Sequence, residues 1–220
     1  MKKVVIWDLD GTILDTLDDL TDSVNYAMRR FGFDELKKEE IRKRLGNGVE
    51  VLIQKSVPTD CKGKKFEEVL TFFKEYYFQN MNNKTKPYDG ICDIMKKLKN
   101  MGYKQAIVSN KFDAAVQELV GKYYDFVDLA LGEKNNFRKK PYPDMVNWVL
   151  EKLNCNKNEA VYIGDSEVDL MTAKNSGIDC ISVLWGFRDK EFLKKAGASI
   201  LVKDMDDLLN VLVDMRKTDD

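Results

Sequence analysis

The segment DLDGT at residues 8–12 places two carboxylates two residues apart, directly after the apolar run of residues 4–7. In an extended segment, residues two apart lie on the same face, so we expect Asp8 and Asp10 to lie close together. Neighbouring carboxylates repel each other, and a divalent cation relieves that repulsion. Oxygen ligands suit Mg²⁺, which also binds phosphate oxygens. Gly11 would let the backbone turn and approach a phosphate, whereas the alternative is an acidic turn that caps a helix.

Two further polar segments follow later in the chain. Ser109 and Asn110 come after the apolar residues 103–108 and could bind an anion at a helix N-terminus. An ordinary helix cap explains the same pair and, taken alone, is the simpler interpretation. Lys140 stands in the basic segment 138–143 and could neutralise a phosphoryl oxygen or a carboxylate, although charge runs usually face water.

The segment GDSEVD at residues 164–169 follows the apolar run 160–163. Asp165 could add a carboxylate to a metal site, and Asp169, one helical turn later, could face the same site. A capped acidic first turn would explain the serine and the glutamate, but not the Gly-Asp pair. The chain contains no histidine. Histidine-based triads and most catalytic zinc sites are therefore excluded, and acid–base chemistry must come from other side chains.

Predicted strands and helices alternate along the chain, and this alternation predicts an α/β fold with a parallel sheet that would position these residues. Strands are predicted at residues 3–7, 103–108, 126–131, 160–163, 180–183 and 199–202. Helices are predicted at residues 113–120, 143–153, 167–175, 191–195 and 204–215, and Gly102 and Gly177 are predicted to end helices. The four polar segments thus come just after four of the predicted strands. In an open α/β sheet, ligands bind outside the carboxyl ends of the strands.

A helical insertion interrupts this alternation early in the chain. Four helices and no strand are predicted between the first strand and the resumption of the pattern, at residues 18–31, 37–45, 49–56 and 66–80. We therefore expect a doubly wound, Rossmann-like parallel sheet core with a small α-helical cap domain inserted after the first strand. The core would comprise residues 1–14 and 84–220 and the cap residues 15–83. Residues 217–220 are predicted to be a frayed tail.

The order and placement of these segments resemble the haloacid dehalogenase-like hydrolases, and within them the phosphoglycolate phosphatase-like branch. The similarity extends from residue 3 to about residue 212 and includes the helical insertion. It also includes the segments GNG at 46–48, WGFR at 185–188 and AGA at 196–198. The resemblance implies a fold and a set of roles for the polar residues.

By that resemblance, Asp8 would be a nucleophile that attacks phosphorus and forms an aspartyl phosphate. Asp10 would protonate the leaving oxygen and then activate water. Mg²⁺ would be held by the Asp8 carboxylate, the Asp10 backbone carbonyl and Asp165. The remaining implied roles are phosphate binding by Gly11, Ser109, Asn110 and Lys140, and orientation of the lysine or of a metal-bound water by Asp169.

The resemblance also implies that the cap selects the substrate. Arg42 would meet a substrate carboxylate or second phosphate, and Gly46 and Gly48 would expose backbone N–H groups. A solvated helix face explains Arg42 equally well. We expect a small phosphorylated metabolite as the substrate, and phosphoglycolate is the leading candidate. The alternatives are a phosphosugar mutase, or a phosphatase for nucleotides, sugar phosphates or pyrophosphate. A phospho-accepting receiver module is disfavoured by the chain length and the helical insertion.

Composition limits the partners. The 220 residues include 36 basic and 37 acidic ones, a net charge of −1, which gives no electrostatic footprint for nucleic acid or for a membrane surface. No apolar stretch approaches the ~18 residues needed to span a bilayer, and the short apolar run near the N-terminus, followed by acids, does not suit a signal peptide. The widely spaced Cys61, Cys92, Cys155 and Cys180 predict free thiols in a reducing cytoplasm. We expect a cytoplasmic monomer or weak homodimer.

Overall fold

The chain folds into two compact units in a computed structural model that describes residues 1–134 and 136–217. One unit is formed by Met1–Leu14 and the chain from Pro87 onward, and the other by Asp15–Lys86. Two short strands, β2 (Leu14–Asp15) and β3 (Lys86–Pro87), pair with each other where the chain passes between the units. The first unit is α/β and the second is helical, so the predicted fold class is confirmed.

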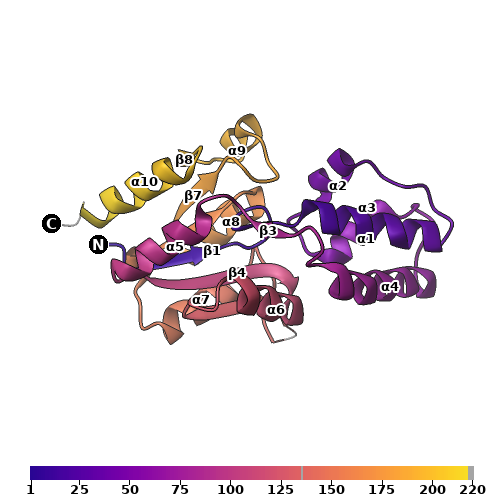
Figure 1. Ribbon diagram of the computed structural model, residues 1–220, viewed down its shortest axis with the longest axis horizontal. Helices are drawn as coiled ribbons and strands as arrows, with labels where there is room; N and C mark the ends of the chain where they lie inside the picture. The colour runs from indigo at the N-terminus through magenta and orange to yellow at the C-terminus, as the bar shows by residue number, and fades with distance from the viewer. Residues whose placement is uncertain (135, 218–220) are drawn as a thin grey trace. The chain divides into compact units, whose positions relative to one another are not determined.

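A six-stranded parallel sheet forms the centre of the α/β unit, in the order β5-β4-β1-β6-β7-β8. Its strands β1, β4, β7 and β8 are labelled in Figure 1. Ile6 of β1 pairs in register with Ala106 on one side and Tyr162 on the other. The middle strands are apolar at successive positions, as expected for strands that are buried on both faces. The strands are β1 (Val4–Trp7), β4 (Lys104–Phe112), β5 (Leu129–Glu133), β6 (Ala160–Gly164), β7 (Asp179–Val183) and β8 (Leu201–Val202).

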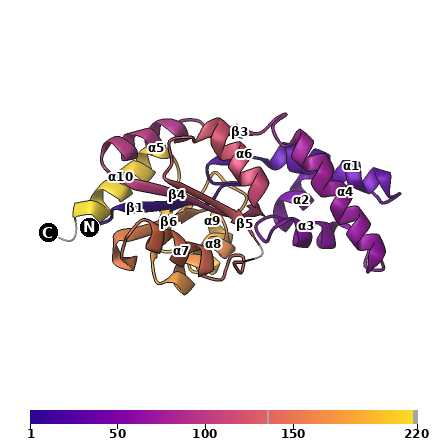
Figure 2. The same ribbon diagram turned by 90° about the horizontal axis from the view of Figure 1, so that it is seen from below.

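Helices cover both faces of this sheet because parallel strands need crossover connections. In Figure 2, α5, α6 and α10 lie on one face, and α7 and α8 on the other. On the second face, Val4 and Ile6 pack in one apolar cluster with Val146 and Val149 of α7. The helices are α5 (Ile91–Asn100), α6 (Asp113–Tyr123), α7 (Asp144–Lys152), α8 (Glu167–Ser176), α9 (Lys190–Lys195) and α10 (Met205–Lys217).

The strand order makes β1 the point at which the winding direction reverses. After β1 the chain adds β4 and β5 on one side of it, and then β6, β7 and β8 on the other. Connections that depart in opposite directions leave a crevice at the carboxyl ends of the strands where the order reverses. Asp8 is the first residue after β1 and therefore lies at this crevice.

The helical unit has its own core. Helices α1 and α4 pack against each other, and Ala27, Met28 and Phe73 are completely buried. Asp19, a buried carboxylate of α1, accepts the backbone N–H groups of Lys84 and Thr85 and so fastens the end of the unit. The helices are α1 (Leu17–Arg30), α2 (Lys38–Arg44), α3 (Val49–Ser56) and α4 (Lys64–Asn80). In the part of the chain that the structure describes, no helix is long and apolar enough to cross a membrane.

Several predicted boundaries are wrong. Strand β4 continues to Phe112, so Ser109 and Asn110 lie within a strand and not at a helix N-terminus, and α6 begins only at Asp113. The polar end of β4 stays in the sheet through an irregular register between Val108 and Phe112, which hydropathy does not reveal. Strand β5 begins three residues later than predicted. Residues 218–220 of the predicted tail lie outside the described residues, while Lys217 ends α10.

Candidate active site

Three buried carboxylates meet at the carboxyl ends of β1 and β6. Asp8 follows β1, Asp165 follows β6, and Asp169 lies in the first turn of α8. Each offers an oxygen, and these atoms all lie within 4.8 Å of one another. All three side chains are buried, with Asp165 and Asp169 only 1% exposed. The fold thus gathers three acids from two segments about 160 residues apart in the sequence.

Lys140 lies between two of these acids. Its Nζ is 2.8 Å from Asp8 Oδ1 and 2.7 Å from Asp169 Oδ1. Asn110 holds the backbone of the same lysine: Lys140 N donates to Asn110 Oδ1 at 2.7 Å, and Asn110 Nδ2 donates to Lys140 O at 3.0 Å. The lysine loop and the end of β4, 30 residues apart in the sequence, are therefore joined by an amide-to-peptide clamp.

The cluster carries more negative than positive charge. Burial, followed by repulsion from Asp169, raises the pKa of Asp8 to about 7, although Lys140 opposes the shift. Burial and the charges on Asp169 and Asp8 raise the pKa of Asp165 well above its usual range. Burial works to lower the pKa of Lys140, but Asp169 and Asp8 outweigh it and hold the ammonium charged.

A divalent cation fits this surplus of buried negative charge. Three carboxylates face one ammonium within the cluster, and the upward pKa shifts of Asp8 and Asp165 show how costly that arrangement is without another cation. Carboxylate oxygens are the donors that hard cations such as Mg²⁺ prefer. The predicted ligands Asp8 and Asp165 lie together in this cluster.

The loop at residues 185–188 fixes the carboxylate of Asp165. The backbone N–H of Phe187 donates to Asp165 Oδ2 at 2.6 Å, and the Thr12 hydroxyl donates to Oδ1 at 3.4 Å. The indole N–H of Trp185 donates to the carbonyl of Thr12 at 2.9 Å and ties the loop to the turn after β1. Gly186 packs so closely that a Cβ there would lie 2.3 Å from the Cβ of Asp165.

Asp10 lies apart from the three-acid cluster and pairs with a second buried lysine. Lys111 Nζ is 2.8 Å from Asp10 Oδ1, and the lysine side chain is 2% exposed against 21% for the aspartate. Lys111 was not among the residues that the sequence predicted for the site. Because the strand was predicted to end at residue 108, the sequence carried no sign that Lys111 is buried; in the structure the lysine lies inside β4 and needs a charged partner.

Ser109 and Gly11 complete the predicted phosphate-binding residues of the α/β unit. Ser109 is 2% exposed, and its Oγ accepts the backbone N–H of Lys111 at 3.2 Å. Gly11 has a φ of +83°, and a Cβ there would lie 2.6 Å from Asp165 Oδ2. Asp165 therefore occupies the space that a side chain at position 11 would need. The sequence did not suggest this reason for a glycine at that position.

Comparison with known proteins points to a single family. Residues 5–183 match the family model of the haloacid dehalogenase-like hydrolases. The chain belongs to this family. Within this family it is an enzyme of the phosphatase class and is similar to phosphoglycolate phosphatases.

Three relatives of this hydrolase illustrate the similarity. The phosphoglycolate phosphatase of Aquifex aeolicus is 32% identical over 84% of this chain and 86% of its own length. That of Vibrio parahaemolyticus is 28% identical over 96% of each chain. The crystal structure of a proposed phosphoglycolate phosphatase from Lactobacillus delbrueckii subsp. bulgaricus shares 39% identity, with a TM-score of 0.92 over 96% of this chain and 99% of that one.

The predicted cap residues of the hydrolase lie in its helical unit. Arg42, in α2, is half-buried, and its Nη1 lies 4.0 Å from Glu39 Oε2. Gly46 and Gly48 have φ values of +108° and +84°, which favour glycine at both positions. Their roles toward a substrate remain predictions.

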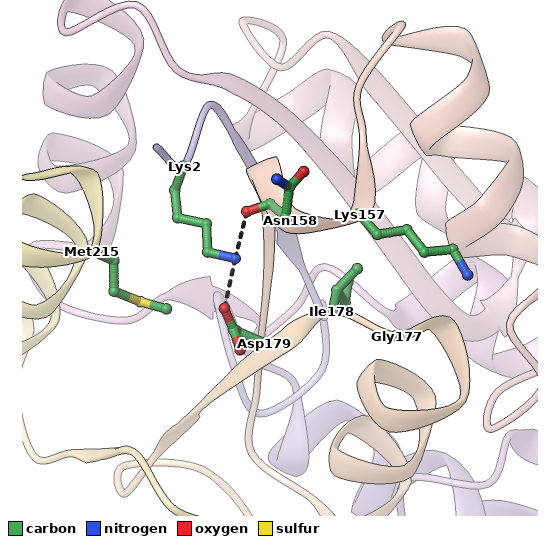
Figure 3. Close-up of a pocket in the computed structure, with 7 residues that line it drawn as sticks. All are labelled: Lys2, Lys157, Asn158, Gly177, Ile178, Asp179 and Met215. Carbon is green, nitrogen blue, oxygen red and sulfur yellow. Dashed lines mark hydrogen bonds and ion pairs between the residues drawn. The ribbon is translucent and has the colours of Figure 1, made fainter. Parts of the chain in front are cut away.

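A cavity of about 500 Å³ lies at the opposite, amino-terminal ends of β1, β6 and β7 (Figure 3). Lys2 Nζ donates there to the carbonyls of Asn158 and Ala160 and pairs with Asp179 at 2.6 Å. The ammonium of Lys2 therefore links three segments of the chain. The lining residues are Lys2, Lys157, Asn158, Gly177, Ile178, Asp179 and Met215.

Proposed function

We propose that this hydrolase is a Mg²⁺-dependent phosphomonoester hydrolase that acts through an aspartyl phosphate on Asp8. The observation that carries the proposal is the buried contact of Asp8 with Lys140 beside two further carboxylates, at the crevice after β1. Phosphoryl transfer demands positioning and charge neutralisation, and this arrangement offers both.

The reaction would proceed in two displacements. An Asp8 oxygen attacks phosphorus, and the bond from phosphorus to the ester oxygen breaks as Asp10 gives that oxygen a proton. Asp10 then takes a proton from water, whose oxygen attacks phosphorus and releases inorganic phosphate and the free Asp8 carboxylate. Lys140 and Ser109 bind the phosphoryl oxygens during both displacements, and Asp169 keeps Lys140 directed toward Asp8.

Mg²⁺ would be held by the carboxylates of Asp8 and Asp165 and by the backbone carbonyl of Asp10. When bound, it supplies positive charge that offsets the negative charge of the phosphate and the acids. The raised pKa values of Asp8 and Asp165 support this assignment, because they report a site that is short of positive charge.

We propose a small phosphorylated metabolite as the substrate, with phosphoglycolate the first candidate. The phosphoglycolate phosphatases among its relatives support this choice. Arg42, Gly46 and Gly48 of the cap would bind the part of the substrate that does not react. We further propose a cytoplasmic monomer or weak homodimer without nucleic-acid or membrane partners, in keeping with four free cysteines.

The test is phosphate release from a panel of small phosphate esters, measured with Mg²⁺, with excess chelator, and after Mg²⁺ is restored. The proposal expects release that the chelator abolishes and Mg²⁺ restores, with phosphoglycolate preferred. Preference for a nucleotide, a sugar phosphate or pyrophosphate would keep the mechanism and change the substrate. Turnover that requires a sugar bisphosphate and releases little phosphate would identify a mutase. Phosphate release that is unchanged by excess chelator would refute the metal requirement.

A further inference from the structure

Tyr162 contacts Lys140 from inside the sheet. This tyrosine is completely buried in β6, and its hydroxyl donates to the carbonyl of Val108 in β4 at 2.8 Å. A hydroxyl has a single proton to donate. The Tyr162 oxygen must therefore accept from Lys140 Nζ, which lies 3.0 Å away.

This contact completes the surroundings of the Lys140 ammonium. An ammonium has three N–H groups, and the acceptors here are Asp8 Oδ1, Asp169 Oδ1 and the Tyr162 hydroxyl. The two carboxylates can change charge or partners during a reaction, whereas the phenol is neutral and held by a backbone carbonyl of the sheet. Tyr162 is thus the acceptor whose position does not depend on the state of the acids.

We propose that Tyr162 is a positioning residue that keeps Lys140 aimed at the transferring phosphoryl group. Phosphorylation would convert the Asp8 carboxylate into an acyl phosphate, so the ammonium would lose its contact with a carboxylate oxygen and meet phosphoryl oxygens in its place. Asn110 fixes the backbone of Lys140, and Tyr162 fixes its Nζ, so the lysine stays in place when Asp8 is phosphorylated. The inference rests on the proposed function, because it assigns Lys140 to that same phosphoryl transfer.

The variant Tyr162→Phe removes the hydroxyl while keeping the ring, and Tyr103→Phe is its matched control. Tyr103 is also buried, and its hydroxyl also donates to a backbone carbonyl, that of Leu212 at 3.0 Å. It stands just before β4, at the amino-terminal end of the sheet and away from the acidic cluster. Each variant loses a hydroxyl that donates to a backbone carbonyl, but only Tyr162→Phe also loses the contact with Lys140, so a difference in kcat between the folded variants reports that contact.

We expect Tyr162→Phe to lower kcat by about tenfold or more, as for a lost hydrogen bond to a charged group, while KM changes by less than about twofold. Orthovanadate, which mimics the five-coordinate phosphoryl group, should bind about tenfold more weakly in calorimetry with Mg²⁺. Tyr103→Phe should match the wild type in all three measurements.

The outcomes separate this inference from the proposed function. Wild-type turnover that is sensitive to chelator, together with equal kcat and orthovanadate affinity for the two variants, would overturn the role of Tyr162 alone. Wild-type protein without such turnover would refute the proposed function, and the calorimetric comparison would still decide whether Tyr162 supports the anion-binding lysine. A rise in KM at constant kcat would also contradict a positioning role.

Discussion

Asp8 shows at the scale of the residue how burial and charge would prepare a carboxylate for the proposed nucleophilic attack. It contacts Lys140 at 2.8 Å and shares its site with Asp165 and Asp169. Burial makes the electrostatic interactions of this cluster stronger than they would be in water. Lys140 holds the Asp8 carboxylate in one orientation. Without a further cation, repulsion among the three buried acids costs free energy.

The first prediction concerns the nucleophile. Asp8→Asn should lower phosphatase turnover by at least about a thousandfold, because the amide cannot form the acyl phosphate in the proposed mechanism. Phosphate release and thermal unfolding would be measured together. Asp19→Asn is the matched control, since Asp19 is also a buried carboxylate but accepts backbone N–H groups of the helical unit. The control should lose stability and keep its turnover, and near-normal rates in Asp8→Asn would refute the mechanism.

The second prediction concerns Lys111. Lys111→Met keeps the length and apolar stem of the side chain but removes the ammonium 2.8 Å from Asp10. With its charged partner gone, the Asp10 carboxylate loses its fixed direction, and we expect kcat to fall by about tenfold or more.

A double-mutant cycle distinguishes this explanation from general damage. If Lys111 acts through Asp10, the variant Asp10→Asn/Lys111→Met should be no slower than Asp10→Asn alone. Multiplication of the two effects would show that Lys111 has a separate role.

At the scale of the element, the loop at residues 185–188 fixes the geometry of the α/β site. It approaches the turn after β1 so closely that a Cβ on Gly186 would lie 2.4 Å from the carbonyl oxygen of Gly11. Phe187 then directs its N–H at Asp165. Close backbone approach, and not freedom of φ, is the reason for glycine at position 186.

The third prediction compares two glycine substitutions. Gly186→Ala should destabilise the protein by about 1–3 kcal/mol, as overpacking does, and should lower turnover because Asp165 must move. Gly121→Ala places the same methyl group on α6, where nothing lies within 4 Å, and should stabilise the protein by about 0.5–1 kcal/mol. Denaturant unfolding and phosphate release check both variants. Equal effects of the two substitutions would contradict the packing argument.

At the scale of the whole molecule, the two units divide the proposed tasks. The acidic cluster, Lys140 and the loop that fixes Asp165 all belong to the α/β unit, whereas Arg42 and its neighbouring glycines belong to the helical unit. A cation that binds the acidic cluster therefore stabilises the α/β unit directly.

The fourth prediction follows from this division. Mg²⁺ at about one hundred times its Kd should stabilise the protein by about 2.7 kcal/mol, and chelator should reverse the effect. Hydrogen exchange with and without Mg²⁺ should show increased protection around β1 and β6, with little change in α1 and α4. Asp165→Asn, which removes a proposed ligand, should respond much less. Equal protection of both units, or an unchanged response in the variant, would contradict a metal site in the acidic cluster.

The sequence by itself determined the fold class. Buried strands such as β1 and β6 are continuous apolar runs, and the helical insertion lacks any strand pattern, so hydropathy periodicity is enough to recognise both. It also identified Asp8, Lys140, Asp165 and Asp169 as candidates, because their types and order are unusual enough to be noticed. The structure brings these four together.

Only the tertiary structure decided which partner each polar side chain meets. Asp10 pairs with Lys111, Asn110 clamps the backbone of Lys140, and Tyr162 accepts from its ammonium. These contacts join segments from about 20 to 100 residues apart in the sequence, and a local pattern contains no information on such pairings. They follow from strand order and register, which are set when the whole core packs and every buried polar group must find a partner.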